Sequence, residues 1–130
     1  MMKILCFGNP MVEGDRLALD VGKRLNGKVG GAEFIVCGIH DIILDVAAES
    51  GETVYILDVV KGIDSVRVIE PESLKATRTI TAHDIDVSFY VRLLSAMGRE
   101  MRVIGIPEGL ELKRASKEVK ELVSFMVKLP

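Results

Sequence analysis

The chain has 130 residues, 48% of them hydrophobic and 28% charged, values that predict one folded domain, residues 1–130, rather than a disordered chain. Its formal net charge of -2 argues against nucleic acid as the main partner, because phosphate binding requires a basic face. No apolar run is long enough to span a membrane, and the apolar opening is too short for a signal segment, so we expect a cytoplasmic protein.

The first unit of the chain is a strand, a tight loop and a helix. The apolar run from Lys3 to Gly8 predicts a buried strand, and the sequence Gly8-Asn9-Pro10 favours a turn. Helical spacing begins after Asp15, so this carboxylate is expected near a helix start, where the helix dipole favours a negative charge. The apolar positions of this helix are Leu17, Leu19, Val21 and Leu25.

The rest of the chain alternates between strand and helix patterns. Strands are expected at 33–37, 53–60 and 101–106, with an antiparallel edge strand at 66–70. Helices are expected at 41–49, from 81 to a stop at Gly98, and from a cap at Ser116 to the C-terminal region. This alternation predicts an α/β domain, a three-layer α/β/α sandwich around a mostly parallel sheet.

The strand at 53–60 carries one anomalous residue. It is a continuous apolar and β-branched run, as expected for a strand covered on both faces, yet Asp58 lies near its end. An ionised carboxylate is costly to bury, so Asp58 must be paired, ligated or placed at the mouth of the strand.

Three residues with side chains that can bind metal or transfer protons can converge in a doubly wound fold. They are Asp15, Asp58 and His83, the last expected in the first turn of a helix. Two carboxylates and one imidazole suit a divalent transition metal with open positions. The positive end of the helix dipole also favours a neutral imidazole, which can bind metal. Each residue has an ordinary alternative: a helix cap for Asp15, backbone hydrogen bonding for Asp58 and a surface position for His83.

Other common catalytic motifs of α/β proteins are absent from the sequence. There is no dinucleotide fingerprint, no Walker-type glycine-lysine pair after a strand, and no Gly-x-Ser-x-Gly elbow. The two cysteines, Cys6 and Cys37, form no paired motif, which favours buried thiols in a reducing compartment over a disulfide or a zinc site.

The order of the short motifs resembles that of the hydrogenase maturation proteases. The residues that carry the resemblance are Ile4-Leu5-Cys6-Phe7-Gly8-Asn9-Pro10 followed by Asp15, then Tyr55-Ile56-Leu57-Asp58, Thr81-Ala82-His83, Val103-Ile104-Gly105-Ile106-Pro107-Glu108, and the closing helix from Ser116. They cover nearly the whole chain in the family's order.

The resemblance implies a five-stranded twisted sheet between helical layers. It also implies an endopeptidase that removes the C-terminal extension of a nickel-iron hydrogenase large-subunit precursor. By this resemblance Asp15, Asp58 and His83 bind the nickel already loaded in the precursor, and Asp15 and Asp58 are the candidate catalytic carboxylates. Other divalent metals suit the same donors. We expect a monomer whose partner is the precursor.

The segment after the second expected strand departs from the family. An Asp-Gly-Gly-Thr type segment is usual there, whereas this chain has Val36-Cys37-Gly38-Ile39-His40. The resemblance places Asn9, Gly38 and His40 in the substrate region, and a solvated loop histidine is the alternative interpretation of His40. The altered segment leaves open a chaperone that binds the precursor through the metal without cutting it.

A peptidyl-tRNA hydrolase-like enzyme is a third hypothesis, because that family also opens with a Gly-Asn-Pro loop. It further requires a tyrosine and a Thr-Arg-His-Asn segment, and residues 11–20 contain neither.

Overall fold

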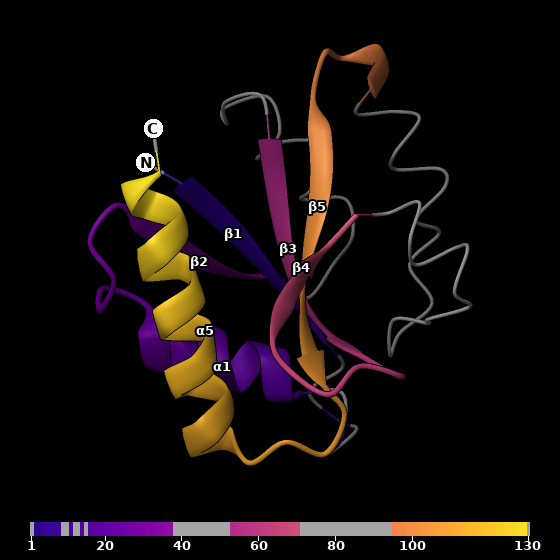
Figure 1. Cartoon of the computed structure of the whole chain (residues 1–130), viewed down its shortest axis with the longest axis vertical. Helices are drawn as coiled ribbons and strands as arrows, with labels where there is room; N and C mark the ends of the chain where they lie inside the picture. Colours follow the sequence, from indigo (N-terminus) through magenta and orange to yellow (C-terminus); the bar gives the residue numbers. More distant parts are fainter. Residues whose placement is uncertain are drawn as a thin grey trace.

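The computed structural model describes residues 2–8, 11, 14, 16–37, 53–70 and 95–129. Its elements form a central sheet with two helices beside it (Figure 1). In chain order they are β1 (Met2–Phe7), α1 (Leu17–Leu25), β2 (Ala32–Cys37), β3 (Thr53–Val60), β4 (Arg67–Ile69), β5 (Glu100–Pro107) and α5 (Leu112–Lys128).

The strands form one five-stranded sheet in the order β2-β1-β3-β5-β4. β2, β1, β3 and β5 are parallel to their neighbours, whereas β4 is antiparallel to β5 at the edge. The α/β class, the mostly parallel sheet and the antiparallel edge strand are therefore confirmed.

The two faces of the sheet are distinguished by the alternation of side chains along each strand. Helices α1 and α5 contact each other on one face, where they cover apolar residues of β1, β3 and β5 such as Ile4, Leu57 and Ile104. The alternate positions, including Leu5 and Ile56, point to the opposite face and are also buried. Both faces are thus covered, which explains why the inner strands read as continuous apolar runs.

Most element bounds agree with the predictions to within two residues, and those of β3 are identical. The expected cap at Ser116 is wrong, because α5 begins at Leu112 and Ser116 lies buried inside it. Leu112 and Ala115 extend the apolar stripe of α5 by one turn towards its start, and packing of that stripe outweighs a serine's preference for a cap.

The helices expected at 41–49 and from residue 81 lie outside the described residues, apart from the end of the second. Residues 95 and 96 are helical, and Gly98 follows in a left-handed conformation, with φ of 74°. The expected stop at Gly98 is confirmed, and glycine suits it because it has no Cβ to clash in that conformation. None of the described helices is long and apolar enough to cross a membrane.

Helix α1 approaches β1 closely at Gly22. A Cβ built on Gly22 would lie 2.5 Å from Sγ and 3.1 Å from Cβ of Cys6, which is itself fully buried. The pair therefore limits how near α1 lies to β1.

We expect Gly22→Ala to destabilise the fold, although alanine is the better helix former. Overpacking costs about 1–3 kcal/mol, whereas the gain in helix propensity is about 1 kcal/mol. Removing the sulfur in Gly22→Ala/Cys6→Ala should recover most of the loss. Urea unfolding of the four proteins in this cycle measures the coupling, and an additive double variant would contradict the close contact.

Candidate functional site

The sheet reverses its direction of growth between β1 and β3. The chain passes from β1 to its neighbour β2 on one side, but β3 lies on the other side of β1. In open parallel sheets such a switch point opens a crevice beyond the carboxyl ends of the two strands, and ligands bind there. The candidate site is therefore the edge at which β1 and β3 end.

Asp58 lies at this edge, near the carboxyl end of β3. Its side chain is 0% exposed, and its position in the strand alternation directs it to the face opposite α1 and α5. Its Oδ1 accepts a hydrogen bond from the backbone N–H of Val59 at 2.8 Å. Such a bond holds the carboxyl group in one orientation close to its own backbone.

The neighbours of Asp58 in the sheet are apolar or lack a side chain. On β1, Phe7 follows the last registered pair, Cys6 with Leu57, and is 1% exposed. On β5, the register partner of Asp58 is Gly105. A carboxylate between such neighbours is poorly hydrated, so its interactions with a ligand are stronger than at an exposed position.

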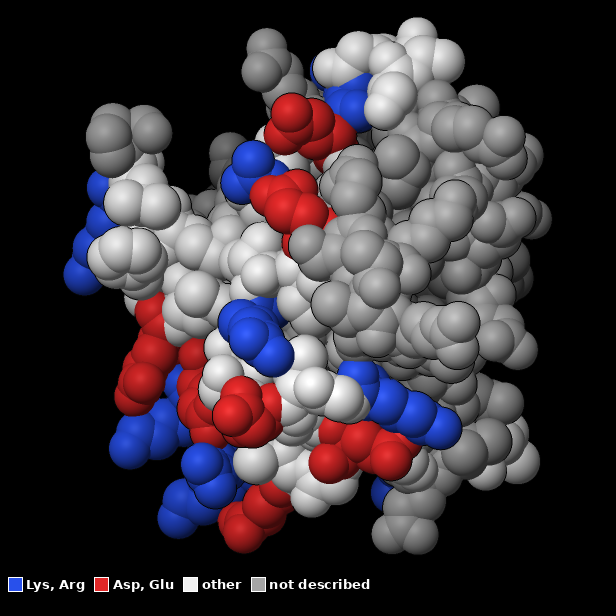
Figure 2. Space-filling view, turned by 45° about the vertical axis from the view of Figure 1, so that its right-hand side comes forward, with Lys and Arg blue, Asp and Glu red and all other residues white. Residues whose placement is uncertain are grey.

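Polar residues follow the carboxyl ends of β3 and β5. Lys61 Nζ lies 3.8 Å from Glu108 Oε2, and both side chains are more than half exposed. An exposed pair of this kind adds about 0–1 kcal/mol to stability, so its main consequence is the placement of charge at this edge. Over the described surface in Figure 2, Lys and Arg alternate with Asp and Glu rather than forming a region of one sign.

The structure describes only one of the predicted site residues, Asp58. The remaining metal-ligand candidates, Asp15 and His83, and the substrate-region candidates, Asn9, Gly38 and His40, lie outside the described residues. Within the described ranges no three His, Cys, Asp or Glu side chains form a group able to hold a metal ion. Convergence of the three predicted ligands stays a prediction.

Gly105 is the residue that the sequence analysis did not assign to the site. It lies inside a strand beside Asp58, and a Cβ built on it would lie within 3.1 Å of three apolar side chains. A glycine inside a strand signals close approach by another group. That signal is present in the run from Met101 to Ile106 and could have identified Gly105 as a neighbour of the site.

Comparison with known proteins gives a clear structural likeness but no sequence match. No protein-family model matches the chain, and no curated protein matches it. Among solved structures, the NiFe hydrogenase maturation protease HycI from Thermococcus kodakarensis KOD1 is 18% identical, with a TM-score of 0.70 over 98% of this chain and 92% of its own.

Two further solved structures match the chain with similar identity, TM-score and coverage. The NiFe hydrogenase maturation protease HybD from Thermococcus kodakarensis is 22% identical, with a TM-score of 0.68 over 98% of this chain and 100% of its own. The endopeptidase HycI from Escherichia coli is 17% identical, with a TM-score of 0.66 over 96% of this chain and 90% of its own. The resemblance noted in the sequence is confirmed at the level of the fold, and the chain has the fold of the NiFe hydrogenase maturation proteases.

Proposed function

We propose that this chain is a hydrogenase maturation protease, an endopeptidase that removes the C-terminal extension of a nickel-iron hydrogenase large-subunit precursor after nickel insertion. The observation that carries the proposal is the buried carboxylate of Asp58 at the switch point of the sheet. Support also comes from the likeness to proteins named as maturation proteases, which extends over nearly the whole chain.

Nickel enters this proposal as part of the substrate. Asp15, Asp58 and His83 are its proposed ligands, two carboxylates and one imidazole that suit nickel and other divalent metals. For Asp58 the fit is supported by its place at the crevice and by its orientation, since Val59 N–H binds Oδ1. Binding through the precursor's own metal would make cleavage depend on nickel insertion.

Peptide hydrolysis requires a base as well as a binding site. Water attacks the scissile carbonyl carbon, the base takes a proton from that water, and the proton is delivered to the leaving nitrogen as the C–N bond breaks. The carboxylate of Asp15 or Asp58 is suited to this transfer, as in a peptidase of the aspartic type. When bound, nickel would supply Lewis acidity to polarise the carbonyl oxygen.

The substrate region in this proposal includes Asn9, Gly38 and His40, on segments that follow β1 and β2 in the sequence. β1 and β2 are parallel to each other, and β1 to β3, so the described ends of β1 and β2 lie at the same edge of the sheet as Asp58. We propose that the protein acts as a cytoplasmic monomer on one precursor molecule.

The proposal is tested by mass spectrometry of a hydrogenase large-subunit precursor incubated with this protein. Nickel-loaded precursor should lose a C-terminal peptide, whereas nickel-free precursor should stay intact. The matched control is nickel-loaded precursor without the protein, which should not be shortened. Equal cleavage with and without nickel would contradict the role of nickel in recognition.

An intact precursor that stays bound to the protein would favour the metal-dependent chaperone. The departure at Val36-Cys37-Gly38-Ile39-His40 is the sequence feature that supports this second function. If the precursor is neither bound nor cleaved, both proposals are overturned. Binding of tRNA, seen on a gel at moderate salt, would then support the peptidyl-tRNA hydrolase hypothesis.

A further inference from the structure

Gly105 leaves a space beside Asp58 on the surface of the sheet. The two residues are register partners on neighbouring parallel strands, so their side-chain positions lie on the same face. Adjacent strands are about 4.8 Å apart. Whatever occupies the space above Gly105 is therefore a lateral neighbour of the Asp58 side chain.

Three apolar side chains fill that space. A Cβ at Gly105 would lie 2.8 Å from Cδ1 of Ile69, 3.0 Å from Cδ1 of Ile63 and 3.1 Å from Cγ2 of Val60. Ile63 and Ile69 are half-buried and pack against the buried Val60 and Val103. We call the group formed by Val60, Ile63 and Ile69 over Gly105 the apolar wall.

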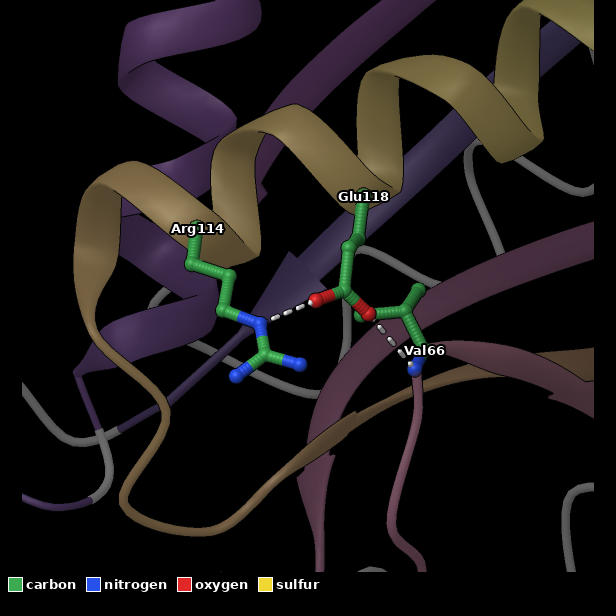
Figure 3. A network of polar contacts seen from close by, with 3 residues as sticks. All are labelled: Val66, Arg114 and Glu118. Atoms are coloured by element: carbon green, nitrogen blue, oxygen red, sulfur yellow. Dashed lines mark hydrogen bonds and ion pairs between the residues drawn. The ribbon is translucent and has the colours of Figure 1, made fainter.

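The segment that supplies Ile63 and Ile69 is anchored at two points, one in the sheet and one on helix α5. β4 pairs with β5, placing Ile69 opposite Val103. Before β4, the backbone N–H of Val66 donates to Oε1 of Glu118 on α5 at 3.4 Å (Figure 3). Glu118 is itself held by Arg114, whose Nε donates to Oε2 at 2.8 Å. These contacts hold the segment that supplies the wall against β5 and α5.

We infer that Ile63 and Ile69 are positioning residues, whose side chains over Gly105 exclude water beside Asp58 and hold its carboxyl group in one orientation. The inference rests on the proposed function, because it assigns these residues to the same site. The position of the Asp58 carboxyl group is important for catalysis, because a small displacement of a reacting group lowers the reaction rate by a large factor. Apolar side chains packed beside it would limit such a displacement.

The first test follows the hydrogen bond from Val59 N–H to Asp58 Oδ1 by amide hydrogen exchange in the full chain. Ile69→Ala opens the wall, so exchange at Val59 should rise about tenfold or more above the change at other β3 amides. Val68→Ala is the matched control: Val68 is the preceding residue of β4, is equally half-buried and packs on the opposite face. Val68→Ala should change the exchange rate of the Val59 amide by the same factor as the rates of the other β3 amides.

The second test measures cleavage of the nickel-loaded precursor. Ile69→Ala should lower kcat roughly tenfold to a hundredfold with little change in KM. Ile69→Leu, which conserves volume, should recover most of kcat, and Val68→Ala should keep the kcat of the unaltered protein. A merely structural role for Ile69 would lower activity in both alanine variants in proportion to their loss of stability.

The two proposals fail in distinguishable ways. If the unaltered protein cleaves no precursor, the proposed function fails, while Val59 exchange still tests the wall. If Ile69→Ala and Val68→Ala change Val59 exchange equally, the inference is overturned even when cleavage is normal. Ile63→Val, a milder change in the same wall, should raise Val59 exchange in the same direction, and no rise would also count against the inference.

Discussion

Replacing Asp58 with asparagine should slow cleavage of the nickel-loaded precursor, with a fall in kcat of about a hundredfold to ten-thousandfold. Asparagine has nearly the same volume and keeps an oxygen that can accept the hydrogen bond from Val59 N–H, seen at 2.8 Å in the carboxylate form. The variant therefore removes the negative charge while retaining the local structure. Single-turnover cleavage followed by mass spectrometry measures the effect.

Asp64→Asn is the matched control for this experiment. Asp64 is an exposed carboxylate in the turn after β3, six residues from Asp58 in the same part of the chain. The same change of carboxylate to amide there should leave kcat unchanged. Full activity of Asp58→Asn would overturn the assignment of Asp58 to the site, whatever the control does.

Replacing Leu57, the residue next to Asp58, with alanine should have the opposite effect to Asp58→Asn. It should greatly lower the stability of the fold. Leu57 is fully buried and points to the face covered by α1 and α5. Truncation removes apolar contacts and leaves a cavity, which costs about 2–5 kcal/mol. Urea unfolding should show a lower midpoint with an unchanged m-value.

The comparison of Leu57→Ala with Asp58→Asn separates the two faces of β3. At urea concentrations below its unfolding transition, Leu57→Ala should still cleave the precursor. Side chains alternate between the two faces along a strand, so Leu57 points away from the crevice. Asp58→Asn should fold but lose most of its cleavage rate. Loss of cleavage in a folded Leu57→Ala protein would show that the two faces are coupled.

Local patterning explains why the strands and several turns could be predicted. The apolar run of β3 has the same bounds in the structure as in the prediction, and Gly98 ends a helix as expected. These features depend on residues within a few positions of each other. The cap predicted at Ser116 failed because the contacts that extend α5 to Leu112 are made with distant elements.

The sequence by itself determined that this is an α/β chain with a carboxylate, Asp58, at the end of its most apolar strand. The pattern of apolar and polar residues along each strand depends only on consecutive residues. A single charged residue within an apolar run can therefore be recognised from the sequence alone. Only the tertiary structure decided that β3 lies between β1 and β5, which makes the ends of β1 and β3 the switch point. It also decided that Gly105 lies beside Asp58, and that the side chains of Ile63 and Ile69 lie over Gly105. Strand order and cross-strand neighbours arise from packing between segments far apart in the chain, and no local pattern encodes them.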